Sequence, residues 1–239
     1  MRPVAAAAVA TGGVAGLCLA HVGPAASWLP PVRDRLTPGL AGRGRPDHVA
    51  LTFDDGPDPR STPHLLDLLD ELEVHATFFV LGSRVERHRA VAAETAARGH
   101  EVAVHGWAHR PQWVPRPQRD VRELRQARAA IEQVCGVRPV WFRPPFGVLT
   151  TGLLRAARRA ELRPVLWGAW GKDWREDRSP AAVERTVVST LHGGTTVLLH
   201  DTSPDGGSEA WRNTLGALPG IVEHCRRAGW DVGPLAEHF

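Results

Sequence analysis

The chain has 239 residues, of which 43% are hydrophobic and 23% are charged, so it can bury one large core and we expect a single main domain. Its 29 basic residues against 26 acidic ones leave a net charge of only +3, and no run of basic residues stands out. This balance argues against nucleic acid as a partner.

The first part of the chain is apolar. Residues 3–20 carry no charged side chain and follow Arg2, which is typical of a secretory signal or of a weak membrane anchor. We therefore expect residues 1–26 to be a signal peptide or an N-terminal membrane anchor, with an uncleaved apolar tail as the alternative. The protein is expected to be exported, either secreted or held at the cell envelope with this segment as its membrane attachment. Residues 27–46, rich in Pro, Gly and Arg, are predicted to be a linker.

Cysteine is scarce in the remainder of the chain, where only Cys135 and Cys225 occur. Two cysteines do not form a disulfide framework for a domain of this size. One bridge between them remains an option in an oxidising compartment.

From residue 47 onward, short apolar runs alternate with segments whose apolar residues recur at helical spacing. Strands are predicted at residues 49–53, 75–81, 101–104, 138–142, 163–169, 195–199 and 230–232. Helices are predicted at residues 65–72, 91–99, 121–136, 153–162, 181–194 and 215–229, and several of them end at a glycine. The alternation predicts an α/β fold in residues 47–239, with a parallel sheet closed or nearly closed as a barrel of about seven strands.

Two of these helices carry a start signal. Ser179 before Pro180 suits an N-cap followed by a proline in the first turn, and Thr62 before Pro63 repeats the pattern.

The stretch VALTFDDGP at residues 49–57 ends a predicted strand on two adjacent carboxylates, Asp54 and Asp55. Successive side chains on a strand point to opposite faces, so the two cannot both be solvated on one surface. Like charges side by side repel unless a positive charge is near. The pair therefore predicts a cation at the end of this strand.

Polar or aromatic residues also follow the next predicted strands. In chain order they are His105 and His109, Arg143, Asp173 and Trp174, and His200. In a barrel of parallel strands all these ends face one rim, where such folds place their functional sites. Each residue alone has an ordinary explanation, such as a helix cap or a surface position. Five separate segments at one rim indicate a single functional site.

The two histidines stand four residues apart in the sequence HGWAH. One helical turn would point His105 and His109 in the same direction. With a carboxylate from the first strand they form a two-histidine, one-carboxylate set, which suits Zn²⁺ or another divalent first-row metal. Such a set leaves coordination positions open for water and substrate.

Five segments, in this order, resemble the motifs of the polysaccharide deacetylase family, carbohydrate esterase family 4. They are TFDDGP at 52–57, H-x-x-x-H at 105–109, RPPFG at 143–147, DW at 173–174 and LLH at 198–200. The resemblance implies a catalytic domain of this family, also called the NodB homology domain, over residues 47–239. It implies a distorted (β/α)7 barrel similar to a TIM barrel, and a divalent metal that is usually zinc, with Co²⁺, Ni²⁺ or Mn²⁺ as other options. The implied activity is removal of acetyl groups from polymers of N-acetylglucosamine, such as peptidoglycan or chitin oligomers, or from acetylated xylan.

The resemblance also implies roles for individual residues. Asp54 would be the general base, and Asp55 would bind the metal together with His105 and His109. His200 would be the general acid that protonates the departing amine, which an amide needs because an amine anion is a very poor leaving group.

Two further residues would orient the general base. By the same resemblance, Arg143 would orient Asp54 through charge-assisted hydrogen bonds, and Asp173 would in turn orient Arg143. The alternative for Asp173 is an ordinary loop carboxylate that pairs with Lys172 or Arg175.

The substrate would be held by residues of three motifs. Pro145 and Phe146 belong to RPPFG, and the resemblance implies that the backbone N–H of Phe146 stabilises the oxyanion. Trp174 and Leu198 would enclose the acetyl group. Other tryptophans could offer faces for sugar stacking, although packing is the more common use of any one of them. These are Trp107, Trp113, Trp170 and Trp211.

The chain departs from the family pattern at three positions. Gly106 stands where the family usually has Ser or Thr, which puts metal affinity or the rigidity of the metal loop in doubt. Trp170 takes the place of an Asp often found three residues before the DW motif. Phe146 replaces a frequent Tyr, a change that leaves its backbone N–H in place.

The sequence thus predicts an exported, metal-dependent hydrolase that acts on an acetylated polysaccharide. An O-acetyl xylan esterase of the same family and a catalytically silent, carbohydrate-binding relative are the alternatives. A magnesium phosphatase built on the acidic pair explains neither the histidine pair nor RPPFG.

Overall fold

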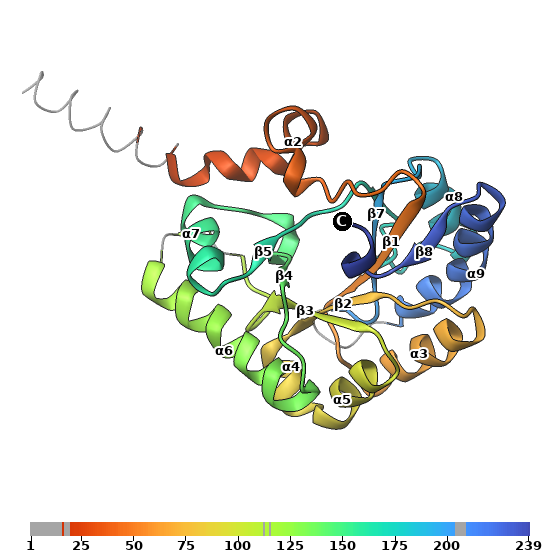
Figure 1. Cartoon of the computed structure of the whole chain (residues 1–239), viewed down its shortest axis with the longest axis horizontal. Helices are drawn as coiled ribbons and strands as arrows, with labels where there is room; N and C mark the ends of the chain where they lie inside the picture. Colours follow the sequence, from red (N-terminus) through yellow and green to blue (C-terminus); the bar gives the residue numbers. More distant parts are fainter. Residues whose placement is uncertain (1–15, 17–19, 112, 115, 204–208) are drawn as a thin grey trace, which may run out of the picture.

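The computed structural model describes residues 16, 20–111, 113–114, 116–203 and 209–239. Its strands form one curled, parallel sheet, and helices lie around the outside of that sheet (Figure 1). The strands are β1 (His48–Asp54), β2 (Thr77–Leu81), β3 (Glu101–Gly106), β4 (Trp141–Phe142), β5 (Arg163–Pro164), β6 (Ala169–Trp170), β7 (Thr196–His200) and β8 (Asp231–Gly233). The predicted distorted (β/α)7 barrel is confirmed.

The barrel is incomplete because one predicted strand is split. The strand order β5-β4-β3-β2-β1-β7-β6 puts β5 and β6 at the two edges of the sheet, with β8 paired to β1. Residues 163–169, predicted as one strand, contribute β5 and β6 at their ends, and the backbone between them has other partners. Leu166 donates its N–H to the carbonyl of Leu40 (2.8 Å) and accepts at its own carbonyl from Arg143.

Longer helices follow most strands and cover the sheet. In the described part of the chain they are α2 (Pro30–Leu36), α3 (Thr62–Glu71), α4 (Gly82–Arg87), α5 (Arg89–Ala97), α6 (Pro117–Cys135), α7 (Thr151–Arg159), α8 (Pro180–Val188) and α9 (Trp211–Arg227). Among the same residues there are also four short 3₁₀ helices, η1 (Gly23–Trp28), η2 (Pro38–Leu40), η3 (Pro145–Gly147) and η4 (Leu235–Glu237). The Ser179 cap is confirmed, since its hydroxyl accepts from the N–H of Ala182 (3.3 Å). Thr62 is instead the first residue of α3, and its hydroxyl bonds elsewhere, so the cap predicted there is wrong.

The segment 27–46, predicted as a linker, contains helical structure and lies against the barrel. It holds α2 and η2, and its Arg33 and Ala41 side chains are buried. The hydroxyl of Thr196 in β7 donates to the carbonyl of Gly42 (2.6 Å). The end of this segment therefore lies against the part of the barrel between β5 and β7.

Most of the predicted signal or anchor at residues 1–26 lies outside the described residues, namely residues 1–15 and 17–19. Among the helices that are described, none has the length and apolar character needed to cross a membrane. Cys135 and Cys225 are both free, so the optional bridge between them is not formed.

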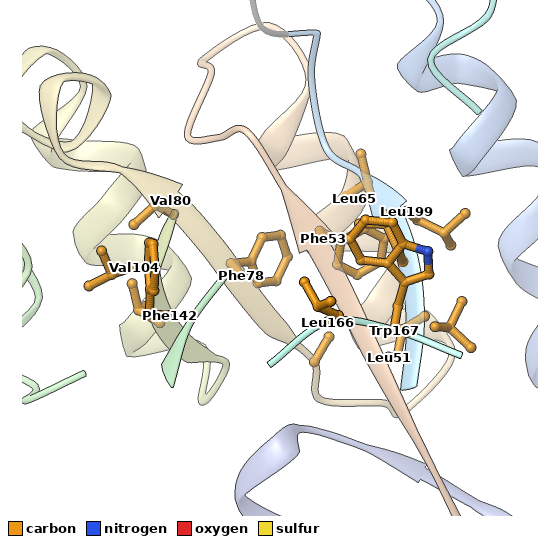
Figure 2. Packing of buried hydrophobic residues seen from close by; sticks show 14 of the residues in the cluster. Leu51, Phe53, Leu65, Phe78, Val80, Val104, Phe142, Leu166, Trp167 and Leu199 are labelled. Atoms are coloured by element: carbon orange, nitrogen blue, oxygen red, sulfur yellow. The ribbon is translucent and has the colours of Figure 1, made fainter. Parts of the chain in front are cut away.

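The main core lies between the sheet and the helices (Figure 2). The rings of Phe53 in β1 and Phe78 in β2 stack with centroids 5.0 Å apart, and Leu65 of α3 packs in the same cluster. Because side chains alternate along a strand, the neighbours of Phe53, namely Thr52 and Asp54, point to the opposite face, into the barrel. The strand that builds the core thus also delivers a carboxylate to the barrel interior.

Candidate active site

The first strand separates its two carboxylates by a change of backbone conformation. Asp54 is the last residue of β1, whereas Asp55 has a φ of 84°, in the left-handed region. Both side chains are buried, with exposed fractions of 3% for Asp54 and 1% for Asp55. The two carboxylates consequently meet different partners.

Asp55 lies beside the two histidines. Its Oδ1 is 3.3 Å from His105 Nε2 and 3.5 Å from His109 Nε2, and these three potential ligand atoms lie within 4.8 Å of one another. Neither carboxylate oxygen of Asp55 has a hydrogen-bond partner in the described structure, although both are buried. Buried charged oxygens without partners are costly, and a divalent cation is the partner that this donor set suits. The residues present therefore fit the expected metal.

The second ring nitrogen of His105 explains its orientation. Nδ1 lies 2.8 Å from the carbonyl oxygen of Arg143, and a carbonyl can only accept, so Nδ1 carries the proton. The lone pair of Nε2 is then free on the side of Asp55. A second hydrogen bond of this type commonly fixes a metal-binding histidine, and nothing in the local sequence around His105 indicates it.

The two histidines converge, but not through a helical turn. His105 is in β3, the chain turns at Gly106, and His109 lies in the bend that follows, with ring centroids 5.5 Å apart. Gly106 has a φ of 109°, which side chains rarely allow. Glycine therefore suits the backbone conformation at position 106, where the family usually has Ser or Thr.

Asp54 is held by Arg143, as the resemblance implied. Nη1 of Arg143 donates to Asp54 Oδ1 (2.7 Å) and to the hydroxyl of Thr52 (2.8 Å), and the fully buried guanidinium lies 4.1 Å from the centroid of the Phe79 ring. Thr52 and Asp54 face the same way on β1, so one arginine can contact both. A buried carboxylate with a fixed, charged partner is a well-oriented proton acceptor.

Asp173 positions a different residue from the one expected. Its Oδ1 lies 3.0 Å from His200 Nδ1, and its Oδ2 accepts from the backbone N–H of His200 (2.7 Å) and from the hydroxyl of Thr214 (2.7 Å). The expectation that Asp173 orients Arg143 is wrong, and so is the alternative pairing with Arg175, which binds Asp177 instead. Thr214 is in α9, far along the chain, so sequence spacing could not connect it to Asp173.

These contacts change the proton affinity of His200. Burial alone would lower the pKa of His200, but the charge and the hydrogen bond of Asp173 outweigh it and raise the pKa to about 9. For Asp55, burial alone would raise the pKa, but the adjacent His105, together with His200 and His109, outweighs it and lowers the pKa to about 2. The site thus holds an imidazolium and a carboxylate at neutral pH.

A cavity of about 310 Å³ opens above these groups at the carboxyl ends of the strands. Its walls are largely aromatic. It is lined by Asp54, Asp55, His105, His109, Phe146, Gly147, Trp167, Trp170, Trp174, Leu198 and His200.

The expected substrate-binding residues divide into two groups. Phe146, Trp174 and Leu198 line the cavity, whereas Pro145 is buried and is not among the lining residues. Phe146 has a φ of 59°, a left-handed conformation of the kind often found at functional sites.

Among the other tryptophans, Trp170 lines the cavity, with its ring centroid 5.2 Å from that of Trp174. Trp167, which the sequence did not single out, lines it as well. Trp211 is buried and stacks on His64, which is a packing role.

Known proteins with similar sequences are deacetylases. The model of the family described as polysaccharide deacetylase matches residues 41–165. A peptidoglycan-N-acetylglucosamine deacetylase of Bacillus cereus is 32% identical over 79% of this chain and 86% of its own length. A chitooligosaccharide deacetylase of Bradyrhizobium sp. is 33% identical over 79% of this chain and 89% of its own. The peptidoglycan-N-acetylmuramic acid deacetylase PdaC of Bacillus subtilis is 35% identical over 67% of this chain, and the match spans 34% of that longer protein.

Solved structures with the same fold have more varied descriptions. A peptidoglycan N-acetylglucosamine deacetylase matches with a TM-score of 0.78 and 27% identity, over 84% of this chain and 92% of that one. An acetyl xylan esterase from Clostridium thermocellum, solved with cobalt, matches with a TM-score of 0.70 and 30% identity, over 79% and 88%. A family 4 pseudoenzyme from Bacillus anthracis matches with a TM-score of 0.74 and 25% identity, over 82% and 67%. Since the family model spans more than half of the residues and relatives above 30% identity match over most of their length, the chain belongs to the polysaccharide deacetylase family.

Proposed function

We propose that this chain is a metal-dependent hydrolase that removes N-acetyl groups, as acetate, from polysaccharides containing N-acetylglucosamine. Peptidoglycan and chitin oligomers are the proposed substrates, because relatives at 32% and 33% identity carry those names. One observation carries the proposal. A single cavity is lined by an arginine-bound carboxylate, a carboxylate with two histidines, and a histidine bound to a third carboxylate.

Asp55, His105 and His109 are the residues that would hold the metal. Zn²⁺ is the proposed ion, with Co²⁺, Ni²⁺ or Mn²⁺ as substitutes, since two imidazoles and one carboxylate suit all four. When bound, such an ion supplies Lewis-acid chemistry, that is, polarisation of the acetyl carbonyl and a lowered pKa of a coordinated water.

Asp54 and His200 would divide the proton transfers. Asp54 accepts a proton from the water as the water oxygen bonds to the acetyl carbon, and Arg143 keeps that carboxylate in one orientation. His200 then donates a proton to the amide nitrogen as the C–N bond breaks, which yields acetate and a free amine. Asp173 supports this step, because it keeps Nδ1 of His200 occupied and favours the protonated ring.

The cavity walls would place the acetyl group. Trp174 and Leu198 offer apolar surface for its methyl, and Trp170 extends that surface. The backbone N–H of Phe146 is the proposed donor to the developing oxyanion, at a residue whose strained φ of 59° turns the chain sharply beside His109.

An O-acetyl xylan esterase is the second candidate, favoured by the similarity to an acetyl xylan esterase at 30% identity. The high proton affinity of His200 favours an amide substrate over an ester. An amine leaving group requires a proton, whereas an alkoxide leaves more readily without one. A silent relative is the third candidate, and the complete set of Asp54, Asp55, His105, His109 and His200 argues against it.

The place of action would be outside the cytoplasm. Relatives named for peptidoglycan point to the cell envelope, and the uncharged residues 3–20 suit export or anchoring. The proposed partner is therefore an acetylated polysaccharide of the envelope or its surroundings.

The test is acetate release by the full-length protein from a panel of N-acetylated chito-oligosaccharide, peptidoglycan and acetylated xylan, with bound metal measured on the same sample. We expect release from the N-acetylated substrates, loss of activity with a chelator and recovery with Zn²⁺ or Co²⁺. The variant Asp54→Asn should lose activity but keep the metal. Release from xylan alone would favour the esterase, and no release by a metal-loaded sample would favour the silent relative.

A further inference from the structure

The turn that follows β1 presents both Asp54 and Asp55, and its backbone is tied to β2 on one side. The N–H of Asp55 donates to the carbonyl of Phe79 (3.2 Å), and the carbonyl of Gly56 accepts from the N–H of Leu81 (2.9 Å). Asp55 itself has a φ of 84°, which is uncommon for a residue with a side chain. Such a conformation persists only where the surroundings hold it in place.

On its other side the turn is tied to Asp201, which directly follows His200 at the end of β7. The N–H of Asp201 donates to the carbonyl of Asp54 (3.3 Å), and the carboxylate of Asp201 lies directly against the backbone of Gly56. The Asp201 side chain is only 1% exposed, so water has little access to take over its role. One buried residue therefore bonds to the turn through its backbone and packs against it with its side chain.

The contact explains why position 56 is a glycine. A Cβ placed on Gly56 would lie 2.0 Å from Asp201 Oδ2, far inside any allowed contact. The φ of Gly56 is not in the left-handed region, so backbone conformation does not require a glycine there. Close approach of the Asp201 carboxylate requires it instead.

Asp201 is in turn fixed by Thr62. The hydroxyl of Thr62 donates to Asp201 Oδ2 (2.6 Å) and accepts from the N–H of Asp58 (2.9 Å). This is why Thr62 does not cap α3. Asp201 Oδ1 has no hydrogen-bond partner among the described residues, so the contacts converge on the other oxygen, Oδ2.

We propose that Asp201 is a positioning residue that holds the Asp54–Gly56 turn, so that Asp55 faces His105 and His109 while Asp54 stays on Arg143. It joins the end of β1, which carries the metal ligand, to the end of β7, which carries the acid. The inference rests on the proposed function only in that Asp55 binds a metal. It assigns to the residue after the LLH motif a role that neither the motif nor the spacing reveals.

The role requires an acceptor oxygen at the position of Oδ2. Two substitutions of Asp201, one that keeps this oxygen and one that removes it, should therefore differ in their effect. Asp201→Asn can keep a carbonyl oxygen in that position, and its amide nitrogen can take the place of Oδ1, which has no partner to lose. Asp201→Leu has a similar volume but no acceptor, so the Thr62 hydroxyl loses the oxygen that it bonds to. Asp120→Leu is the matched control, because Asp120 is also a buried aspartate, at 3% exposure, but lies in α6 away from the turn.

The experiment is calorimetric titration of Zn²⁺ into the metal-free, full-length variants, with the absorption spectrum of bound Co²⁺ and the melting temperature recorded on the same samples. Loss of an outer partner of a metal ligand typically costs 10- to 100-fold in metal affinity. We expect a loss of about 10- to 100-fold and an altered Co²⁺ spectrum for Asp201→Leu, and values within about 3-fold of the parent for Asp201→Asn. Asp120→Leu should lower the melting temperature but leave Zn²⁺ affinity and the Co²⁺ spectrum unchanged.

Parent affinity and spectrum in a folded Asp201→Leu protein would overturn the inference, and so would equal losses in the Leu and Asn variants. If Asp201→Leu does not fold, Thr62→Val decides. It removes the hydroxyl that fixes Oδ2, and a loss of Zn²⁺ affinity supports the inference whereas parent affinity overturns it. These readouts need no glycan, so a parent protein that binds Zn²⁺ but releases no acetate contradicts the proposed function and leaves this inference standing.

Discussion

Buried polar groups lie at both ends of the barrel, and the two ends differ in how those groups are satisfied. At the amino ends of the strands, the hydroxyl of Thr77 donates to Glu101 (2.7 Å) and accepts from the N–H of Leu235 (2.8 Å). At the carboxyl ends, both oxygens of Asp55 are buried without a partner in the described structure. The polar groups at the amino ends bond to one another, whereas the Asp55 oxygens at the carboxyl ends can still bind a ligand.

The histidines show the same difference. His238 Nε2 lies 3.1 Å from the carbonyl of Gly42 and must donate there, so its Nδ1 accepts from His48 Nδ1 (2.8 Å). Of the four ring nitrogens of this pair, one is left without a hydrogen bond. It is the unprotonated Nε2 of His48, which lies 3.9 Å from the carboxylate of Glu237. In Figure 1 the C-terminal segment that carries His238 lies over the centre of the ring of strands. The amino end thus leaves a neutral ring nitrogen without a partner, whereas the carboxyl end leaves both charged oxygens of Asp55 available to a cation.

The largest expected effect is the loss of a metal ligand. His109→Ala should abolish Zn²⁺ binding and lower kcat/KM by roughly 1,000-fold or more, because a catalytic ion contributes several kcal/mol to transition-state stabilisation. Calorimetry and acetate release measure the two effects. The corresponding change at the other end, His238→Ala, should lower the melting temperature but leave Zn²⁺ affinity intact. Zn²⁺ binding and acetate release that survive in His109→Ala would contradict the assignment of His109 as a metal ligand.

Removal of the charge beside the acid should have the next largest effect. Asp173→Asn is expected to lower kcat on the order of 100-fold, since His200 loses the carboxylate that raises its pKa. The basic limb of the pH profile should move to lower pH, because a histidine with a lower pKa loses its proton earlier as pH rises. Kinetics between pH 6 and pH 10 test this, and Asp177→Asn, at an exposed carboxylate nearby, is the control. An unchanged basic limb would contradict the role assigned to Asp173.

The turn between the two histidines supplies a test of stability. Gly106→Ser restores a residue type common in the family, yet it should destabilise the protein by about 1–3 kcal/mol because of the φ of 109°. Urea unfolding of the metal-free protein measures the change. Gly136→Ser is a useful comparison, since that glycine also has a positive φ, of 70°, at the end of α6, away from the site. A stabilised Gly106→Ser protein would show that strain is not why glycine stands there.

The smallest expected effect is an opposite pH dependence of stability at the two ends. Burial is the main cause that lowers the pKa of His48 to about 4, so its contribution to stability is present above about pH 6.5 and is lost as pH falls towards 4. The pKa of His200 is raised to about 9, so its contribution is present below about pH 6.5 and is lost as pH rises through 9. The measurement is the urea midpoint of the metal-free proteins as a function of pH. Relative to the parent, His48→Gln should lose less stability as pH falls, and His200→Gln should lose less stability as pH rises. The same pH dependence in both variants would contradict this assignment.

Sequence by itself determined which residues gather at the rim. Parallel strands must end on the same side of a barrel, so Asp54, Asp55, His105, His109 and His200 could be placed together from the pattern of strands alone. Hydrophobic periodicity also identified six of the helices that cover the sheet, because burial on one face repeats every 3.6 residues, but it missed the short α4.

Only the tertiary structure decided which partner each of these groups has. Asp173 binds His200 rather than Arg143, and the backbone of Leu166 binds Leu40 and Arg143 rather than a neighbouring strand. Thr214 and Asp201 support the site from α9 and from the end of β7, at sequence separations of 41 residues from Asp173 and 139 from Thr62. The physical reason is that a hydrogen bond depends on positions within a few tenths of an ångström, which packing of the whole barrel sets, whereas periodicity reports only which face a residue occupies.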